Sequence, residues 1–152
     1  MPKSLDLAGY PAYITTNTLN RVPLFADSGN ADVVIRALYY CRKAGWIHLL
    51  AFVVMPDHLH FIAVLLGEKT LSQLLHSIKS YSSKQINERL GKEGGNWQAG
   101  KWEFTIGSRE VLLQKVAYIH NNPVRRGLLE RPEDYPFSSA NPKFETDLGL
   151  YL

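Results

Sequence analysis

The sequence predicts an α+β fold, a ferredoxin-like β-α-β-β-α-β antiparallel sheet with an additional C-terminal helix. Segments rich in β-branched and aromatic residues alternate with segments whose apolar residues recur at helical spacing. A Pro-Asp pair joins the two middle strand-like segments and predicts a hairpin. No repeat, low-complexity tract or flexible linker divides the 152 residues, so a single domain over residues 1–152 is expected.

The first half of the chain supplies a strand, a helix and the hairpin. Residues 12–18 (AYITTNT) have the composition of a strand. Asn30 is placed to cap a helix over residues 31–45, which carries an apolar face and ends in glycine. Residues 46–54 and 59–66 are the two strands expected to pair in the hairpin.

A second helix is expected to begin at Thr70, because Thr70 and Gln73 have the spacing of a capping box. Gly91 is placed to end it. Tyr81 and Gln85 pair a tyrosine with an amide one turn later, but Tyr81 belongs to the apolar stripe and is assigned to packing. The stripe expected to face the core comprises Leu71, Leu74, Leu75, Ile78, Tyr81, Ile86 and Leu90.

The last strand and a third helix follow a glycine-containing loop. Aromatic and aliphatic residues alternate with polar ones over residues 102–106, which predicts a half-buried strand and places Trp102 in the core. Ser108 is placed to cap a helix over residues 109–122, and Pro123 is expected to stop it. The core face of this helix is predicted to be Leu112, Val116 and Ile119.

Charge and cysteine content narrow the class of protein. Residues 76–131 hold 10 of the 17 Lys and Arg residues but 5 of the 14 Asp and Glu residues. This excess suits a phosphate-binding face, although plain solvated surfaces show similar imbalances. Cys41 is the only cysteine, so an intrachain disulfide and a multi-cysteine zinc site are excluded.

The composition also bears on location. The longest apolar stretch, residues 46–66, contains three histidines, a proline and an aspartate, so no membrane span is predicted. The N-terminus has no uninterrupted apolar segment after a basic start, and no signal peptide is expected. We therefore expect a cytoplasmic protein without a membrane partner.

His58 and His60 occupy alternate positions of a predicted strand and are expected to present two imidazoles on one face. Imidazole is a common ligand of divalent metals, so the pair would supply two ligands of a metal site. A pair at this spacing also arises by chance. The histidines alone therefore leave a structural role open.

The third predicted helix carries a polar stripe. Gln114, Tyr118 and Asn122 lie at positions i, i+4 and i+8, opposite the apolar face. A tyrosine hydroxyl is a weak nucleophile unless a metal polarises the group that it attacks. The amide oxygen of Asn122 is placed to complete a two-histidine metal site one turn from Tyr118. Without the histidines, a half-buried packing role would be preferred for Tyr118.

These motifs resemble a known family. The His-hydrophobic-His strand of the HUH nucleases is similar to VVMPDHLHFIAV, and the Tyr-x-x-x-Asn-Pro-Val-Arg signature of the REP-associated tyrosine transposases is similar to YIHNNPVRRGL. The resemblance extends over most of the chain, in the same order, through RVPLFAD, LSQLLHSIKSYSSKQIN, WQAGKWEF and PEDYPFSSA.

The resemblance implies metal-dependent single-strand DNA cleavage and strand transfer through a 5′-phosphotyrosine intermediate, on hairpin-forming repeats. It implies that His58, His60 and Asn122 hold Mg²⁺ or Mn²⁺, and that Tyr118 is the attacking group on a catalytic helix. Related insertion-sequence enzymes have glutamine at the position of Asn122. The implied partner is single-stranded or hairpin DNA, bound by a monomer or a homodimer, because some relatives exchange the tyrosine helix between subunits.

Contacts to DNA phosphates are expected from basic residues on the polar side of the second helix and near Tyr118. Trp97 and Trp102 are candidates for stacking on unpaired bases, with core packing preferred for Trp102. The phosphate-contact candidates are Lys79, Lys84, Lys101, Arg109, Arg125 and Arg126.

Two other function classes are weighed against this one. A noncatalytic single-stranded nucleic-acid-binding module would also use a ferredoxin-like sheet with basic edges, but the sequence lacks the aromatic motif of RNA-recognition domains. A water-activating metallohydrolase could use His58, His60 and Asp57, although it would need a further ligand. Covalent capture of DNA distinguishes the three classes.

Overall fold

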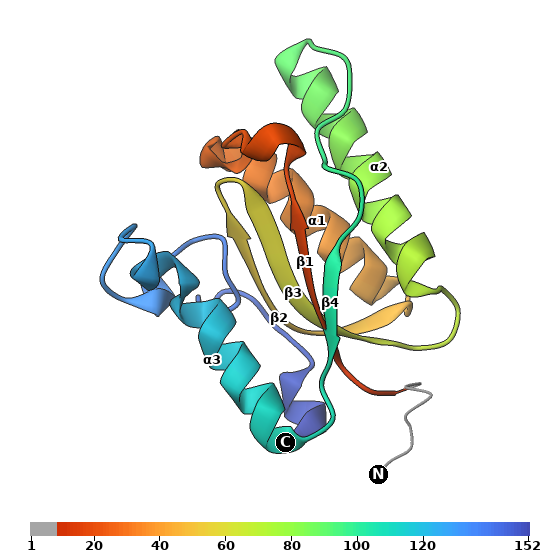
Figure 1. The fold of residues 1–152 in the computed structure, drawn as a ribbon, viewed down its shortest axis with the longest axis vertical. Coiled ribbons are helices and arrows are strands. Elements are labelled where there is room, and N and C mark those ends of the chain that lie inside the picture. Colours follow the sequence, from red (N-terminus) through yellow and green to blue (C-terminus); the bar gives the residue numbers. More distant parts are fainter. Residues whose placement is uncertain (1–8) are drawn as a thin grey trace.

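A computed structural model of the chain describes residues 9–152 and contains a four-stranded sheet with helices on both faces (Figure 1). The strands run in the order β2-β3-β1-β4, and all neighbours are antiparallel. This arrangement confirms the predicted ferredoxin-like α+β fold with an additional helix. The strands are β1 (Ala12–Asn17), β2 (Ile47–Met55), β3 (His58–Leu65) and β4 (Trp102–Thr105), and the helices are α1 (Ser28–Lys43), α2 (Leu71–Leu90) and α3 (Arg109–Arg125).

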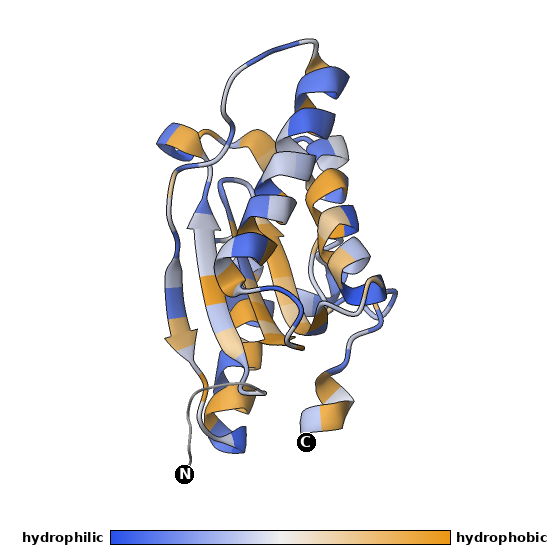
Figure 2. Cartoon of the chain, turned by 90° about the vertical axis from the view of Figure 1, so that its right-hand side faces the viewer, coloured by the Kyte–Doolittle hydropathy of each residue, from blue (hydrophilic) through white to orange (hydrophobic). Residues whose placement is uncertain are grey.

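The two faces of the sheet bury separate clusters of side chains. Leu59 and Phe61 of β3 pack in the cluster that includes residues of α1 and α2. Ile62 and Val64 pack in the cluster that includes residues of α3. Because both faces are covered, β2 and β3 are buried along almost their whole length. Figure 2, seen from the α2 side, shows mostly hydrophilic residues on the outward surface of that helix.

The helix starts differ in how well the sequence predicts them. Asp27, not Asn30, caps α1, because its carboxylate accepts hydrogen bonds from the backbone of Gly29 and Asn30. Asn30 is buried in the first turn, where its amide donates to the carbonyl of Leu24. The capping box that starts α2 is present as expected.

The apolar stripe of α2 agrees with the prediction at Leu74, Leu75, Ile78 and Ile86, which are buried, but Leu90 at its end is exposed. Tyr81 is 42% exposed, so its assignment to core packing is wrong. Ser82 takes the buried position instead, with its hydroxyl donating to the carbonyl of Ile78 and accepting from the indole of Trp97. Because these hydrogen bonds satisfy the serine hydroxyl, a polar residue lies in the stripe at a position that hydrophobic periodicity passes over.

Pro123 does not stop α3, which continues to Arg125. Proline lacks its own backbone N–H but leaves its carbonyl free, and the amide of Leu128 donates to that carbonyl. The chain leaves the helix at Gly127, whose φ of +74° is readily adopted only by glycine. The extension keeps Arg125 on the same helix as Tyr118.

The strand β4 lies at an edge of the sheet and pairs only with β1 among the strands of residues 9–152. All four of its residues are exposed, so the placement of Trp102 in the core is wrong; of the alternating apolar residues over 102–106, only Ile106, just after the strand, is buried. The alternation of apolar and polar residues along a strand shows which side chains share a face, but it does not show whether another layer covers that face. The indole of Trp97 packs against the core instead, with its ring centroid 5.2 Å from that of Phe25.

The segment after α3 packs along the free edge of β2 and forms hydrogen bonds with it. Ser138 forms an isolated antiparallel bridge with Val53, and Asp147 accepts hydrogen bonds from Arg42 and from the backbone of Leu49. The tail therefore holds β2 from its open side. No helix within residues 9–152 is both long and apolar enough to cross a bilayer.

Candidate active site

The imidazoles of His58 and His60 lie side by side on the face of the sheet that α3 covers. Both side chains are buried, and their Nε2 atoms are 3.1 Å apart. Leu59 between them faces the opposite layer. The alternation of β3 therefore directs two ring nitrogens to one point, as ligands of a shared ion would be directed.

Asp57 fixes the orientation of His58. Its Oδ1 lies 2.7 Å from Nδ1 of His58, and its Oδ2 lies 3.1 Å from a guanidinium nitrogen of Arg21. A carboxylate is only an acceptor, so Nδ1 of His58 carries the proton and, in the neutral ring, Nε2 has a free lone pair. Arg21 reaches this carboxylate from a left-handed backbone conformation with φ of +56°, which is uncommon outside glycine.

His60 is held from the neighbouring strand. Thr15 lies opposite His60 in the β1–β3 register, and its hydroxyl oxygen is 2.8 Å from Nδ1 of His60. The hydroxyl of Tyr13 is 3.2 Å from the same nitrogen. These contacts occupy Nδ1 and leave Nε2 directed at His58.

Burial and positive charge keep both imidazoles neutral. Burial lowers the pKa of His58 despite the opposing effect of Asp57. Burial, the adjacent imidazole of His58 and the positive charges of Arg126, Arg125 and Arg21 lower the pKa of His60 to about 3. Burial alone would raise the pKa of the Asp57 carboxyl, but contacts with His58 and Arg21 lower it overall. A neutral imidazole is the protonation state in which a ring nitrogen can bind a cation.

Tyr118 lies beside His60 in the same chain. Their ring centroids are 6.3 Å apart, and the tyrosine is 47% exposed on the surface of α3. The guanidinium of Arg125 lies 3.9 Å from the centre of the Tyr118 ring and also donates to the Tyr118 carbonyl. The ring is thus held by a cation within reach of the histidine pair and remains open to solvent.

Asn122 is buried one turn beyond Tyr118 on α3. The same helical stripe reaches Arg126 at the end of α3, and the positive charge of Arg126 lowers the pKa of both imidazoles. Two neutral imidazoles and an amide oxygen form a donor set that fits a divalent ion. Within residues 9–152, no three His, Cys, Asp or Glu side chains are close enough together to hold a metal ion, so a site at the histidine pair would need a ligand of another type, such as the amide of Asn122.

The structure separates the six basic residues singled out in the sequence. Arg125 and Arg126 lie at the site. Lys101 is beside β4 and pairs with Glu103, while Arg109 is exposed at the far end of α3 from Tyr118. Lys79 donates to the carbonyls of Gln98 and Gly100, which ties α2 to the loop before β4.

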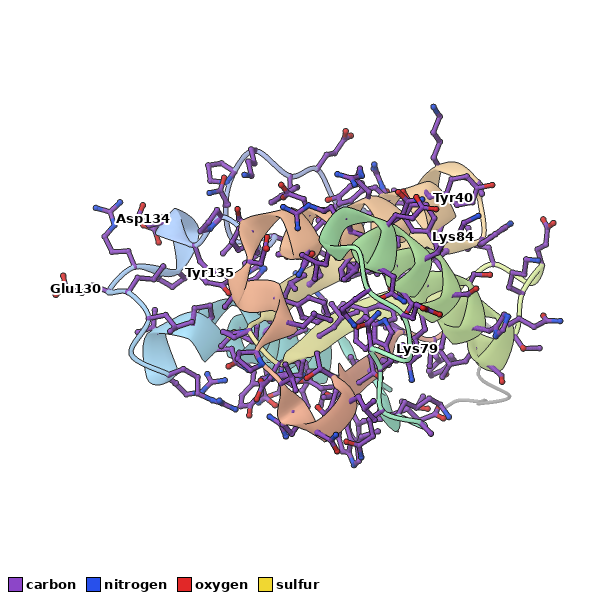
Figure 3. The ribbon with its side chains drawn as sticks, turned by 90° about the horizontal axis from the view of Figure 1, so that it is seen from above. Tyr40, Lys79, Lys84, Glu130, Asp134 and Tyr135 are labelled. Carbon is purple, nitrogen blue, oxygen red and sulfur yellow. The ribbon has the colours of Figure 1, made fainter. Side chains whose placement is uncertain are left out.

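Lys84 lies on the opposite side of the sheet from Tyr118. It lines a cavity between α1 and α2, together with Tyr40. Figure 3 shows both side chains over the two helices. The structure therefore does not bring Lys84 to Tyr118.

Four residues that the sequence did not single out also surround the histidine pair and Tyr118. Arg21 and Thr15 reach it through loop conformation and strand pairing, for which the sequence carries no local signal. Tyr13 shares the β1 face with Thr15. Lys115 could have been found, because it lies three positions before Tyr118 and its ammonium lies 6.0 Å from the tyrosine ring centre.

Known proteins resemble this chain in sequence and in fold. The family model described as "Transposase IS200 like" matches residues 12–122. A REP-associated tyrosine transposase of Escherichia coli K12 is 35% identical over 142 residues, which are 91% of this chain and 80% of that protein. A relative from Haemophilus influenzae is 28% identical over 109 residues, which are 65% of this chain and 62% of that protein, less than two thirds of its length.

A solved structure resembles the fold closely. It is a REP-associated tyrosine transposase bound to a REP hairpin, with a TM-score of 0.71 at 24% sequence identity. The match covers 95% of this chain and 88% of that one. At 24% identity, this likeness shows that the two proteins share a fold.

Proposed function

The chain belongs to the IS200-like transposase family, and on that premise we propose that it cleaves and rejoins single-stranded DNA with Tyr118 as the nucleophile. The observation that carries the proposal is the position of Tyr118 beside His60 within one chain, at 6.3 Å between ring centroids. Because nucleophile and histidine pair belong to the same chain, a monomer would be able to carry out the reaction.

The reaction follows from the groups around Tyr118. The tyrosine oxygen attacks the phosphorus of a phosphodiester, a 5′-phosphotyrosine bond forms, and the bond to the 3′-oxygen breaks. The tyrosine proton leaves to solvent and the departing 3′-oxygen takes up a proton. Because the phosphotyrosine keeps the energy of the broken bond, a second 3′-hydroxyl can reverse the step and join strands without ATP.

The cations beside Tyr118 would position the phosphate. The guanidinium of Arg125 covers the tyrosine ring, and its positive charge favours the developing phenolate as well as the phosphate anion. The Lys115 ammonium lies 6.0 Å from the centre of the same ring, and the charge of Arg126 acts on the histidines. These charges surround the position at which the attacked phosphate would lie.

His58, His60 and Asn122 would hold Mg²⁺ or Mn²⁺. Such an ion, when bound, withdraws charge from a non-bridging phosphate oxygen and orients the phosphate for in-line attack. The chain contributes the neutral state of the imidazoles, which burial enforces, and their orientation, which Asp57 and Thr15 fix.

Hairpin-forming repeats are the proposed substrate. A protein of the same fold was solved with a REP hairpin bound, and the E. coli relative is a REP-associated tyrosine transposase. The exposed tyrosine and its flanking cations suit a phosphate in an unpaired segment beside such a hairpin.

The test is covalent capture. Wild-type protein incubated with labelled hairpin DNA and Mn²⁺ should carry label through denaturing electrophoresis, and Tyr118→Phe should lose all of it while keeping its fold. Tyr13 also lies beside His60, but it is buried and its hydroxyl contacts Nδ1 of His60, so it is not placed to replace Tyr118. Tyr81→Phe is the matched control, since Tyr81 is an exposed helical tyrosine without a neighbouring histidine pair, and should remain active. Capture of label by Tyr118→Phe would show that Tyr118 is not the nucleophile. Release of both DNA ends by the wild-type protein without an adduct would indicate hydrolysis.

A further inference from the structure

We propose that β4 is a stacking surface for unpaired bases next to the phosphate that Tyr118 attacks, with Trp102 and Phe104 as its stacking residues. The inference rests on the proposed function, because it places the strand that Tyr118 cuts. We call these two residues the β4 platform.

The β4 platform is built from two exposed aromatic rings. Trp102 is 55% exposed and Phe104 is 38% exposed. Their ring planes are within 3° of parallel, with centroids 6.3 Å apart. Exposed aromatic residues on an edge strand expose the protein to aggregation, and a soluble domain retains few of them without a ligand to cover them.

Strand register places the β4 platform on the face that carries the active site. Thr15 is opposite His60 on one side and opposite Trp102 on the other, so all three side chains share a face of the sheet. Tyr13 is opposite Phe104. The platform is therefore two strands away from the histidine pair, in the same row.

Tyr13 bridges the platform and the nucleophile. Its ring meets that of Trp102 edge-on with centroids 5.8 Å apart, and its centroid lies 6.4 Å from that of Tyr118. Tyr13 is itself buried, so it forms a wall that a ligand does not displace. A strand with its phosphate at Tyr118 would have its neighbouring nucleotides over Trp102 and Phe104.

Positive charge follows the same route. The Lys115 ammonium lies 5.1 Å from the Phe104 ring centre and 6.0 Å from that of Tyr118, between the platform and the nucleophile. Arg125 adds a second cation at the Tyr118 ring, with its guanidinium 3.9 Å from the ring centre. Exposed aromatic faces combined with cations along a track are the features that bind single strands, because bases stack on the rings and phosphates meet the charges.

A polar pocket of about 330 Å³ opens beside Trp102. Lys79 holds part of its wall in place through the carbonyls of Gln98 and Gly100. A base stacked on Trp102 would have its polar edge near these groups. The pocket is lined by Thr15, Thr16, Asn17, Gln98, Ala99, Gly100, Lys101 and Trp102.

The experiment separates bases from phosphates. Binding by fluorescence anisotropy would be measured for a labelled oligothymidylate of about 20 nucleotides and for an abasic chain of the same length. Trp102→Ala should weaken oligothymidylate binding about tenfold and leave abasic binding unchanged, because stacking requires a base. Trp102→Phe, which keeps an aromatic face, should stay within about threefold of wild type.

Tyr40→Ala is the matched control, because Tyr40 is also an exposed aromatic residue but lines the cavity on the opposite side of the sheet, and it should not change either affinity. Unchanged oligothymidylate binding by Trp102→Ala would overturn the inference, as would an equal loss on both probes or an equal loss in Tyr40→Ala. Failure of the proposed function has a separate signature, the absence of a wild-type adduct on hairpin DNA. A Trp102-dependent affinity for oligothymidylate would stand without that adduct.

Discussion

Nδ1 of His58 lies 2.7 Å from Oδ1 of Asp57, and this contact sets which nitrogen of the imidazole is free. Asp57 occupies the two-residue turn between β2 and β3, directly before His58. The turn that closes the hairpin therefore also orients the first histidine of the proposed metal site. Arg21 pairs with the same carboxylate and holds it from the opposite side.

Replacing Asp57 should weaken metal binding without removing a ligand. In Asp57→Asn the amide can donate to His58, so the imidazole loses its enforced tautomer and its negatively charged partner. We expect Mn²⁺ affinity measured by calorimetry to fall about 10- to 100-fold. Asp134→Asn, an exposed change in the tail, is the control, and an unaltered affinity in Asp57→Asn would show that the carboxylate does not orient the histidine.

Replacing the histidines should have a larger effect than replacing Asn122. His58→Ala and His60→Ala each remove an imidazole, the strongest ligand type of the proposed set, and should abolish both Mn²⁺ binding and adduct formation. Asn122→Ala removes a neutral amide and should reduce the affinity less. Thermal unfolding checks that each variant folds, and a greater loss in Asn122→Ala than in His58→Ala would reverse the ranking of the ligands.

DNA binding should depend on salt through the cations at Tyr118. The logarithm of the affinity for a single strand falls with the logarithm of salt concentration in proportion to the phosphates contacted, about 0.7 per contact. Arg125→Ala and Arg126→Ala should each lower that slope. Lys84→Ala is the comparison, because Lys84 lies on the opposite side of the sheet, and a slope reduced only in Lys84→Ala would place the DNA there.

Acid should destabilise the fold partly through His120. Its Nε2 lies 2.7 Å from the hydroxyl oxygen of Ser139, and burial lowers its pKa. Because the unfolded chain binds a proton near pH 6.5 and the folded chain resists it, stability is full above that pH and falls as the pH drops below it.

The matching variant is His120→Gln, which cannot take up this proton. The fall in melting temperature from about pH 7.5 to about pH 5.5 should be smaller in His120→Gln than in wild type. It should not vanish, because burial lowers the pKa of His58 and His60 in the same direction. Parallel pH profiles for the two proteins would show that folding does not change the pKa of His120.

The sequence alone determined the features that depend on spacing within one element. Alternation in β3 placed His58 and His60 on one face, helical spacing placed Asn122 one turn from Tyr118, and the hairpin turn fixed where β3 begins. Element order and hydrophobic periodicity then gave the ferredoxin-like topology. These relations are local, so backbone geometry enforces them in any structure that contains those elements.

Only the tertiary structure decided relations between elements. The pairing of β1 with β3 brings Thr15 to His60, and the continuation of α3 through Pro123 keeps Arg125 on the Tyr118 ring. The edge position of β4 exposes Trp102, whose alternation pattern is the same as that of a covered strand. Burial and long-range contact depend on which surfaces other elements cover, and that information is distributed over the whole chain.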